Sequence, residues 1–478
     1  MEKTEVYINA GQSDCHKGDH PYGSAGEVFS VEPGKDCRLE FDTLPVSGER
    51  IWLRLTVAVD VERDLRLSIR PEAGPAKPIE WEIRKPCFWQ VFEVELTPIR
   101  EQLLRKPRMI LSLQDPEDCS LCLYRHAPES IHTPHLLAET PGEGGWSELE
   151  QTLCSHASLQ PFGWLEGCVL DGISALLPDP LAASALDEHW KYFLEDDGAL
   201  SYLNPAGDRI RKRLYSIEST LPFANPPTEG LDWNIILNFW ESNQLENGLV
   251  ADINVSPVGK PSTLTGISAE GCYTVAYPMA KLGELLGKEQ LFEQAQVQLR
   301  ERNRILFQGH AVYQKQYIGR ELYFPNWARA LGWFLIGHGE TLRHIPRELW
   351  DGEVVEHFKG LCRLAIKWQL KSGLWAVFID RKLDPDTSGS SAILAGLSIA
   401  CSLGLLEMDA TEAIQKGIMA LEGYISADGL LRGCAQLNRG GEELQVSPYR
   451  VIAPFAMGLA VRAYHEWLAV GQTSLKAE

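Results

Sequence analysis

The sequence predicts a mainly α-helical toroid of the (α/α)6 type, preceded by an antiparallel β-sandwich domain. One observation is a phrase that returns five times, in which a helical stretch is followed by a glycine and a short apolar stub. The other is the hydrophobic period, which is two in the first 130 residues and helical from about residue 148. The five phrases lie at residues 197–200, 247–250, 308–311, 372–375 and 428–431.

The spacing of the glycines in these phrases indicates a series of helical hairpins. Gly198, Gly248, Gly309, Gly373 and Gly429 are separated by 50, 61, 64 and 56 residues, which is the length of a two-helix hairpin with its loops. Glycine enters the left-handed backbone conformation without steric cost, and helices commonly end on it. We therefore expect a helix to end at each of the five glycines.

Residues 1–130 are predicted to form the β-sandwich. Apolar and polar residues alternate in short runs that are separated by Pro, Gly and Asp turns, which is typical of antiparallel sandwiches. The Pro- and Gly-containing stretch 131–147 is the expected linker. The predicted strands are 38–41, 51–57, 65–69, 89–96, 109–113 and 121–124.

Residues 148–478 are predicted to form the helical toroid. Segment 288–306 is amphipathic and charged, as expected of an outer helix, whereas segments 389–404 and 449–468 are apolar nearly all round, as expected of inner helices. The helices make five hairpins, and residues 146–175 would supply a sixth. The predicted helices are 182–196, 209–223, 231–245, 268–286, 288–306, 326–343, 352–371, 389–404, 409–425 and 449–468.

Composition and charge restrict the partners of the chain. The 478 residues carry a formal net charge of −20, which argues against nucleic-acid and anionic-membrane partners, because both attract basic surfaces. The first residues contain no apolar signal region, and the most apolar window, 392–406, is interrupted by glycines and serines. We expect a cytoplasmic protein whose eleven cysteines are reduced. A homo-oligomer is compatible with these data.

The inner helices of such a toroid present their N-termini at one end, where the side chains of their first turns converge. Free N–H groups at these N-termini also favour anionic ligands. This rule selects Glu218, Glu270 and the segments 324–329, 386–391 and 448–450.

Several of these segments also carry a family resemblance. Residues 327–334, WARALGWF, resemble the W-x-R-G-x-G/A-W signature of the unsaturated glucuronyl and rhamnogalacturonyl hydrolases, and residues 386–392 are similar to that family's E-x-S-x-S-A. Residues 270–283 are similar to the family's D-T-x-x-M-x-x-P-F-L-A-x-L-G, with Glu270 at the position of the catalytic aspartate. The resemblance spans about residues 200–468 and implies an (α/α)6 barrel.

The resemblance implies a glycoside hydrolase that releases a terminal uronic acid from an oligosaccharide without a cofactor or metal. A 4,5-unsaturated uronic acid is an enol ether, so a carboxyl group protonates C4 while water adds at C5. Glu270 and Glu218 would be the catalytic pair, and Arg329 would hold the substrate carboxylate in a bidentate contact. The other implied substrate-binding residues are Trp327, Trp333, Ser388, Tyr449 and Arg450.

Three departures from the family pattern leave alternatives open. Glutamate replaces aspartate at position 270, Ala330 replaces the usual glycine, and Pro278 lies one residue out of step. These departures are compatible with a saturated uronic acid, whose inverting hydrolysis needs two carboxyl groups roughly 6.5–9.5 Å apart. Alternatives of other classes are a polysaccharide lyase with Tyr273 or Tyr449 as its base, and a carbohydrate-binding protein without catalysis.

Simpler structural roles are available for some of the same residues. Asp386 and Ser388 suit the cap of the helix that follows them. Arg329 suits a buried ion pair with an acid such as Glu340, because an unpaired buried guanidinium is costly.

A zinc site in the β-domain is the remaining alternative. Cys119 and Cys122 are three residues apart, and Cys15, His16 and His20 lie elsewhere in the same domain. Residues three apart on a strand point to opposite faces, and the domain lacks a second closely spaced pair. We therefore expect no metal site.

Overall fold

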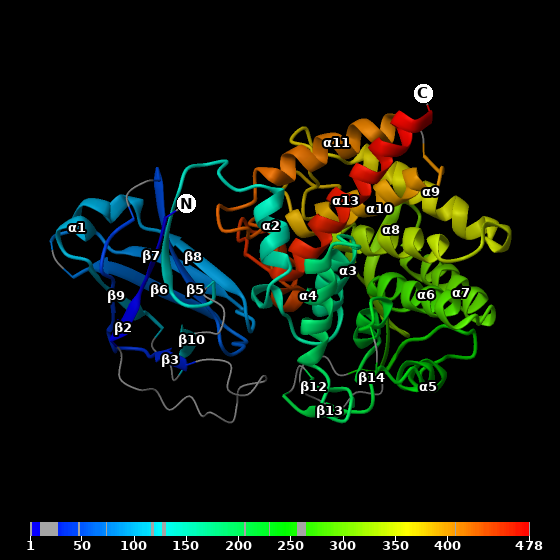
Figure 1. Cartoon of the computed structure of the whole chain (residues 1–478), viewed down its shortest axis with the longest axis horizontal. Helices are drawn as coiled ribbons and strands as arrows, with labels where there is room; N and C mark the ends of the chain where they lie inside the picture. Colours follow the sequence, from blue (N-terminus) through cyan, green and yellow to red (C-terminus); the bar gives the residue numbers. More distant parts are fainter. Residues whose placement is uncertain are drawn as a thin grey trace. The chain divides into compact units, whose positions relative to one another are not determined.

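The computed structural model divides the chain into two compact units. The β-unit comprises Met1–Thr152, Ile425–Arg432 and Gln436–Ala453. The helical unit comprises Leu153–Tyr424, Gly433–Ala435 and Pro454–Glu478 (Figure 1). The structure describes residues 2–9, 27–45, 48–72, 74–115, 119–126, 131–204, 207–228, 230–255, 264–406 and 408–477.

The β-unit is built from short antiparallel strands. They are β1 (Glu2–Glu5), β2 (Tyr7–Asn9), β3 (Glu27–Val31), β4 (Cys37–Glu40), β5 (Arg50–Thr56), β6 (Asp64–Pro71), β7 (Ile79–Arg84), β8 (Val91–Glu95), β9 (Arg108–Leu113), β10 (Leu121–His126) and β11 (His135–Glu139). One sheet has the order β1-β11-β5-β8, a second has the order β2-β4-β9-β6-β7, and β3 pairs with β10. The predicted antiparallel β architecture is confirmed.

Alternation of apolar and polar side chains gives these sheets one buried face. On β6, Leu65, Leu67 and Ile69 are fully buried, whereas Arg66 is exposed. Because successive strand residues point to opposite faces, this pattern places three apolar side chains in the core. Each of the six predicted strands corresponds to an observed strand. Strands β1, β2, β3, β7 and β11 were not predicted, and most of them are short or carry charged outward residues.

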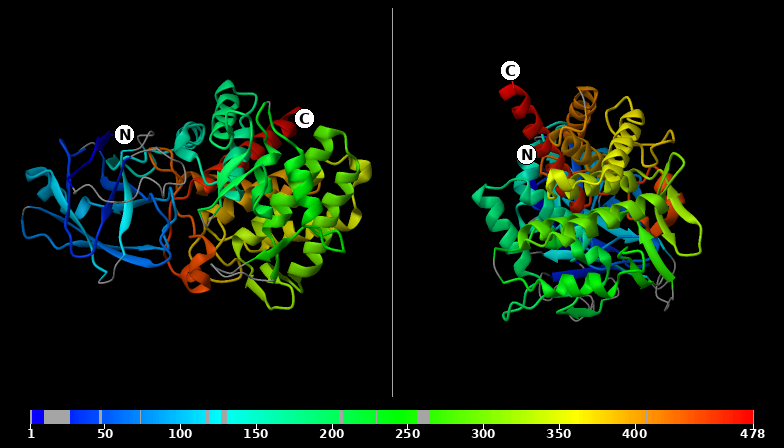
Figure 2. Two further views of the ribbon diagram at one scale, coloured as in Figure 1. Left: turned by 90° about the horizontal axis from the view of Figure 1, so that it is seen from below. Right: turned by 90° about the vertical axis from the view of Figure 1, so that its right-hand side faces the viewer.

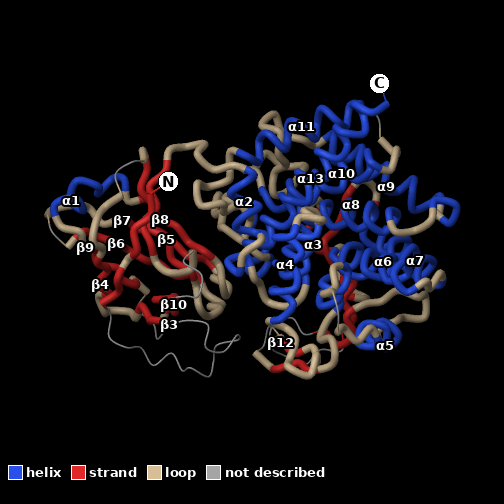
Figure 3. Tube along the Cα trace, viewed as in Figure 1, coloured by secondary structure: helices blue, strands red, loops and turns tan. Residues whose placement is uncertain are grey.

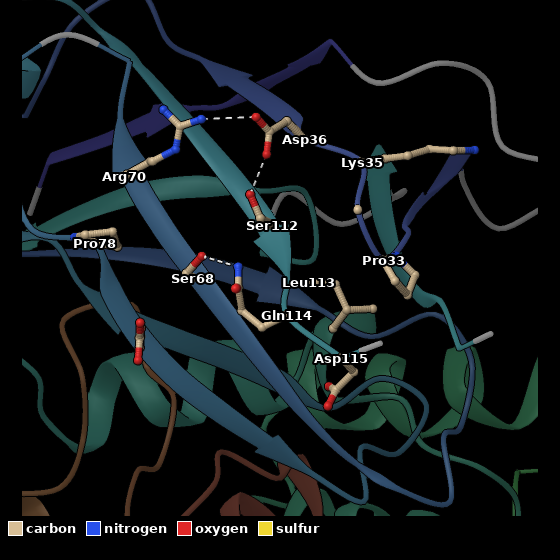
Figure 4. Close-up of a pocket in the computed structure, with 12 residues that line it drawn as sticks. Pro33, Lys35, Asp36, Ser68, Arg70, Pro78, Ser112, Leu113, Gln114 and Asp115 are labelled. Atoms are coloured by element: carbon tan, nitrogen blue, oxygen red, sulfur yellow. Dashed lines mark hydrogen bonds and ion pairs between the residues drawn. The ribbon is translucent and has the colours of Figure 1, made fainter. Parts of the chain in front are cut away.

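The polar face of the five-stranded sheet carries a cavity of about 690 Å³ (Figure 4). Arg70 Nη2 donates to Asp36 Oδ2 at 3.0 Å, and Ser112 Oγ donates to Asp36 Oδ1 at 2.7 Å. Gln114 Nε2 donates to Ser68 Oγ at 2.8 Å. None of the lining residues is aromatic, and these three hydrogen bonds join polar groups of the lining to one another. The cavity is therefore a polar hollow that offers no stacking platform for a sugar ring.

The structure departs from the predicted domain boundary in two respects. The predicted linker 131–147 contains β11, which pairs with both β1 and β5 and so lies inside a sheet. Residues 425–432 and 436–453, predicted to belong to the toroid, fold with the β-unit. Pro and Gly in the linker segment lie around β11 and not within it, which is why the composition of the segment suggested a loop.

Buried charges attach residues 425–432 to the sheet of the β-unit. Arg54 of β5 is 1% exposed, and its Nη2 lies 3.2 Å from Asp428 Oδ1 and 3.2 Å from Glu93 Oε2. Arg432 donates to Glu93 at 2.8 and 3.0 Å and lies 2.6 Å from Glu139. Such pairs join residues that are hundreds of positions apart, so no local pattern predicts them.

The helical unit contains a closed ring of inner helices. They are α3 (Trp164–Ser174), the 3₁₀ helix η3 (Ile217–Ala224), α6 (Tyr277–Leu286), α8 (Ala328–Arg343), α10 (Thr387–Ser402) and α13 (Pro454–Ala477). Each packs against the next in this order, and α13 packs against α3. Figure 2 gives two further views of the ribbon. The outer helices are α4 (Pro180–Lys191), α5 (Asn234–Ser242), α7 (Gln290–Leu306), α9 (Gly352–Lys367) and α11 (Met408–Glu422).

The (α/α)6 architecture is therefore confirmed. The predicted sixth hairpin, residues 146–175, corresponds to α2 (Trp146–Leu153) and α3, and α2 ends at the boundary between the two units. Two further short helices, α1 (Arg100–Arg105) and α12 (Gly441–Val446), belong to the β-unit.

Small residues let the inner helices approach one another closely. A Cβ atom at Gly332 of α8 would lie 2.5 Å from Ala392 Cβ of α10. A Cβ atom at Gly396 of α10 would lie 2.4 Å from Leu335 Cβ of α8. These glycines allow α8 and α10 to pack with little space between their backbones, which explains the small, apolar composition of both helices.

The five recurrent glycines adopt the predicted backbone conformation, but they do not cap the helices. Their φ angles are 74°, 85°, 67°, 100° and 74° in chain order. In the turn at Gly373, Leu370 N donates to Leu374 O at 2.9 Å and Gly373 N donates to Leu370 O at 3.0 Å. Helix α9 already ends at Lys367. The repeated phrase therefore encodes a tight turn that follows the outer helix and directs the chain back toward an inner helix.

Short strands lie within the helical unit, where the sequence predicted helix or loop (Figure 3). They are β12 (Ser201–Leu203), β13 (Arg209–Arg211), β14 (Asp252–Val255), β15 (Leu264–Ser268), β16 (Phe307–Gln308), β17 (Ala311–Tyr317) and β18 (Leu322–Pro325). The predicted helix 209–223 is replaced by β13 and η3, which contains Pro222. Strands β14, β15, β17 and β18 are hydrogen-bonded in one sheet, which we call the β-arm.

Three expectations concern membranes, metals and thiols. Among the described residues, no helix is long and apolar enough to cross a membrane, and no group of three or more His, Cys, Asp or Glu side chains could hold a metal ion. Cys15, His16 and His20 of the zinc alternative lie outside the described residues. Of the cysteines in the described ranges, nine form no disulfide bond, whereas Cys122 is disulfide-bonded, which departs from the expectation of fully reduced thiols.

Candidate active site

Glu270 lies where the β-arm meets the π-helical turn η4 (Cys272–Ala276), which leads into α6. Ala269 N donates to Gln314 O at 2.8 Å, so the pairing of β15 with β17 continues to the residue before Glu270. The side chain of Gln314 then donates through Nε2 to Glu270 Oε1. Strand pairing and this amide contact together fix the orientation of the Glu270 carboxyl group.

Glu218 lies in the first turn of η3, next to an acid from the β-arm. Asp252 Oδ1 accepts a hydrogen bond of 2.9 Å from Ile217 N, which holds the first residue of η3 against β14. This contact connects the inner ring to the β-arm beside Glu218. The sequence selected Glu218 because it begins an inner helix, and the structure places it in that position on a 3₁₀ helix.

The pKa of Glu218 is raised to about 8. The largest cause is burial, which disfavours the charged form, and the negative charges of Glu270 and Asp252 raise the pKa further. The positive charge of Lys315 acts in the opposite direction. Glu218 and Glu270, which the sequence paired, are thus close enough to influence one another, and Glu218 keeps its proton at neutral pH.

Lys315 of β17 supplies the positive charge of this cluster. In the β-arm, Gly266 pairs with Asp252 on one side and with Tyr317 on the other, so these residues share one face. A Cβ atom at Gly266 would lie 3.1 Å from Lys315 Cε and 3.5 Å from Nζ. The lysine side chain therefore crosses the β-arm above a position that has no side chain of its own.

The ammonium group of Lys315 is stabilised in its charged form. Burial lowers its pKa, but the negative groups around it outweigh that effect, so the pKa is raised above its usual value. Its Nζ also lies 5.0 Å from the centre of the Tyr317 ring, within the range of a cation–π contact. The groups that raise the pKa are Tyr317, Asp252, Glu270 and Glu218.

Arg302 of α7 holds the strands that carry the acids. Its side chain is fully buried, and it donates to Ser268 O at 3.1 Å and to Val250 O at 2.7 Å. A Cβ atom at Gly271 would lie 2.1 Å from Arg302 Nη2. Glycine at this position lets the guanidinium pack against the backbone directly after Glu270. Arg302 is therefore a structural support of the site.

Arg329, predicted to bind the substrate carboxylate, is enclosed in the protein. It is 1% exposed, and its Nε lies 3.8 Å from Asp386 Oδ2. Its Nη2 donates to Ala435 O at 3.2 Å, and its guanidinium lies 4.3 Å from the centre of the Trp327 ring. The buried ion pair that the sequence offered as a simpler role is present, with Asp386 as its acid in place of Glu340.

Ser388 is also fully buried, as part of a helix cap. Asp386 caps α10 by accepting from Ser388 N at 3.0 Å and from Ser388 Oγ at 2.7 Å. The same carboxyl group accepts from Ala435 N at 2.9 Å. These hydrogen bonds cap α10 and hold the loop at Ala435, and they account for the conformations of Asp386 and Ser388. Ligand contact by Ser388 stays a prediction.

The predicted tryptophans line the interior of the helical unit. Trp333 is 2% exposed and stacks on Tyr273 with ring centres 5.8 Å apart. Trp327 is 3% exposed. Tyr273 in turn donates through its hydroxyl to Asp171 Oδ2 at 2.6 Å. Trp333 is therefore a core residue in this structure.

Tyr449 and Arg450 belong to the β-unit. The hydroxyl of Tyr449 accepts from Arg84 N at 2.9 Å, and burial raises its pKa above the usual range. Arg450 Nη1 donates to Ser447 O at 2.8 Å. The structure places these two residues in a unit separate from Glu218 and Glu270, so their contribution to the same site stays a prediction.

Sequence reasoning missed three residues of the site, namely Asp252, Gln314 and Lys315. All three lie on the β-arm, whose strands were not predicted. Alternation over 311–317, with Val312 and Gln314 buried and residues between them partly exposed, is a strand signal that could have found Gln314 and Lys315. Asp252 carried no local signal, because its strand is short.

Comparisons with known proteins agree with this architecture. Residues 269–470 match the model of Glycosyl Hydrolase Family 88. No curated protein matches the chain significantly. Similar solved structures include a possible member of the GH105 family from Salmonella enterica subsp. enterica serovar Paratyphi A, with 15% identity and a TM-score of 0.56. That similarity covers 68% of this chain and 92% of the other.

Two further solved structures share the fold. An unsaturated glucuronyl hydrolase specific for heparin has 11% identity and a TM-score of 0.52, over 70% of this chain and 96% of that one. A polysaccharide lyase has 16% identity and a TM-score of 0.51, over 69% of this chain and 98% of that one. Residues 269–470 are thus similar to glycosyl hydrolase family 88, and the helical unit shares its (α/α)6 fold with these solved structures.

Proposed function

We propose that this protein releases a terminal uronic acid from an oligosaccharide, with Glu218 as the proton donor and Glu270 as its partner base. The observation that carries the proposal is the position of Glu218 in the first turn of η3, beside Asp252, where burial and the neighbouring acids raise its pKa to about 8. A general acid is most effective when its pKa lies near the working pH. Glu218 therefore has a proton to donate at neutral pH.

For a 4,5-unsaturated uronic acid, the two carboxyl groups divide the reaction between them. The O–H bond of Glu218 breaks as its proton forms a new bond to C4 of the enol ether. A water molecule then adds its oxygen to C5 and gives a proton to Glu270. The resulting hemiketal opens by breaking the bond between C5 and the ring oxygen, so that C5 becomes a ketone and C1 a hemiacetal. Collapse of this hemiacetal to an aldehyde breaks the bond at C1 and releases the rest of the oligosaccharide as an alcohol. The electron pairs and protons balance without a cofactor.

This proposal reverses one feature of the role implied by the resemblance. The family position of the catalytic aspartate falls on Glu270, but the structure raises the pKa of Glu218. Glu218 is accordingly the acid, and Glu270, oriented by Gln314, is the base. A saturated uronic acid would use the same pair, with Glu218 protonating the leaving oxygen and Glu270 activating water. A cytoplasmic location also stays part of the proposal.

Support for a uronic acid substrate comes from the comparisons. The family model covers Glu270 and the inner helices from α6 to α13, and a structure of the same fold is an unsaturated glucuronyl hydrolase. The lyase alternative has a neighbour of similar TM-score. However, its candidate base Tyr273 is 1% exposed, and burial with the charge of Asp171 raises its pKa well above the usual value.

The test is a paired assay of the wild-type protein and Glu270→Gln. One substrate is a lyase-generated disaccharide with an unsaturated uronic acid, followed by loss of its enol-ether absorbance. The other is an aryl β-glucuronide, followed by release of the phenol. We expect the wild type to consume the unsaturated disaccharide, and Glu270→Gln to lose activity by about 10²–10⁴-fold, the typical contribution of a general base.

Each other outcome changes the assignment in a defined way. Turnover of the aryl glucuronide alone would assign the protein to saturated uronic acids. Appearance of enol-ether absorbance from a uronic acid polymer would establish the lyase. Binding of the disaccharide without turnover of either substrate would overturn hydrolysis and favour the carbohydrate-binding alternative.

A further inference from the structure

The proposed substrate brings a carboxylate into a site that already contains several acids. Glu270 and Asp252 lie near Glu218 and raise its pKa. A second anion in such a place is repelled unless a cation offsets it. The cation that binds a uronic acid must therefore lie close to these acids and be reachable by a ligand.

The two arginines Arg302 and Arg329 do not meet this requirement. Arg302 is fully buried, and its guanidinium donates to Ser268 O, Val250 O and the side chain of Gln298. Arg329 is 1% exposed and lies between Asp386 and Trp327. Both guanidinium groups are already used to hold the protein together.

Lys315 meets the requirement. It is partly exposed, and its side chain rests on Gly266 of the β-arm, with Nζ above the Tyr317 ring at 5.0 Å. Asp252 shares the same face of the β-arm. The lysine is thus held along its length by the strand and the aromatic ring, while its ammonium group lies among the acids of the site.

We propose that Lys315 binds the substrate carboxylate and so gives the site its specificity for uronic acids. This inference rests on the proposed function. In the sequence, that role was implied for Arg329, and the structure transfers it to a residue of the β-arm. Three N–H donors on a flexible stem let a lysine follow the carboxylate as C5 changes from planar to tetrahedral. A rigid, buried guanidinium could not do so.

The rival role for Lys315 is that of a counter-ion to Glu218, Glu270 and Asp252. In that role it would affect every substrate equally, whether or not the substrate carries a charge. The two roles are separated by comparing an unsaturated uronide with its methyl ester, which has the same ring but no carboxylate.

The experiment measures kcat and KM of the wild type, Lys315→Met and Lys315→Arg on both compounds. For Lys315→Met we expect KM for the uronide to rise on the order of 10- to 100-fold, as for loss of a charge-assisted hydrogen bond. KM for the methyl ester should change less than about threefold. Lys315→Arg, which keeps the charge, should restore most of the affinity for the uronide. Circular dichroism confirms that each variant is folded.

Arg329→Lys is the matched comparison, because it tests the role implied by the resemblance. The assignment of the carboxylate to Lys315 would be overturned if KM rose equally for both compounds in Lys315→Met. It would also be overturned if selectivity for the uronide were lost in Arg329→Lys alone. Calorimetric binding of the disaccharide to Glu270→Gln, with and without Lys315→Met, separates the two proposals. If binding depends on Lys315 but the wild type does not turn over the disaccharide, hydrolysis alone is refuted. If the wild type turns over the disaccharide and Lys315→Met has the same KM, the role of the lysine alone is refuted.

Discussion

The surroundings of Glu218 raise the pKa of its carboxyl group, so that the group keeps its proton at neutral pH. Burial is the largest cause of its raised pKa, about 8, and two neighbouring acids add to it. Above this pH the proton is lost, so we expect kcat/KM to fall as pH rises beyond about 8. Glu218→Gln should lower kcat by about 10²–10⁴-fold and remove this limb of the pH profile, which initial-rate measurements across pH would show.

The same carboxyl group affects stability in a direction that does not depend on activity. Because the folded protein binds the proton of Glu218 more tightly than the unfolded chain, stability should fall as pH rises from about 4.5 to about 8. Glu218→Gln has no proton to lose, so its melting temperature relative to the wild type should be higher at about pH 8 than at about pH 5. Glu246→Gln, at an exposed position, is the control and should show no such trend. A relative melting temperature that does not vary with pH would contradict the raised pKa.

Residue identity alone did not separate ligand contact from structural support. Arg329 and Ser388 were selected correctly as residues near the starts of inner helices, but both are buried, in an ion pair and in a cap. Glu218 and Glu270 were selected by the same rule and form an electrostatically connected pair. Burial and partners decide between these roles, and both depend on the packed structure.

At the scale of elements, a π-helical turn separates Glu270 from the proline that departs from the family motif. Pro278 lies one residue later than the motif places it when counted from Glu270, whereas Ala280, Leu282 and Gly283 are in step with the motif. The turn Cys272–Ala276 is π-helical, and such a turn holds one residue more than an α-helical turn. Because an added residue would displace all of these later positions equally, the turn does not explain an offset that is confined to the proline.

Gly271, which lies between Glu270 and the π-helical turn, has no room for a side chain. A Cβ atom there would lie 2.1–2.3 Å from three atoms of the Arg302 guanidinium, which backbone carbonyl groups hold in place. We expect Gly271→Ala to destabilise the protein by about 1–3 kcal/mol, the usual range for overpacking, and to lower kcat by moving Glu270. Thermal unfolding and initial rates measure the two effects.

Gly360→Ala provides a matched control in the outer helix α9. A Cβ atom at Gly360 has only the end of Arg363 near it, at 4.0 Å. Alanine in a helix interior is favoured over glycine, so this variant should gain about 0.5–1 kcal/mol of stability with unchanged activity. If both glycine variants behaved alike, the packing of Arg302 against Gly271 would not be what constrains the site.

At the scale of the whole molecule, the chain passes from the helical unit into the β-unit and back near its C-terminal end. Asp428 holds the segment 425–432 in the β-unit through its ion pair with Arg54, and both side chains are fully buried. Removing one partner of a buried ion pair costs about 3–5 kcal/mol. We expect Asp428→Asn to lose stability of this order in urea unfolding and to make residues 425–432 accessible to proteolysis.

An exposed ion pair on the same β-unit serves as the control. Arg66 and Glu82 lie 4.0 Å apart with side chains 76% and 43% exposed, and such pairs contribute about 0–1 kcal/mol. Arg66→Gln should therefore leave the unfolding midpoint nearly unchanged. Equal effects of Asp428→Asn and Arg66→Gln would show that the buried network does not hold residues 425–432 in place.

The sequence by itself determined the fold class, because the hydrophobic period and the recurrent turn glycines reflect local backbone geometry. Both can be recognised without knowledge of contacts between distant residues. It also determined the two candidate acids, since helix starts can be located from the same patterns. Only the tertiary structure raises the pKa of Glu218, brings the charge of Lys315 near the acids, and places residues 425–432 with the β-unit. Burial, charge proximity and contacts between residues far apart in the chain, as for Arg54 with Asp428 or Lys315 with Glu218, exist only after folding.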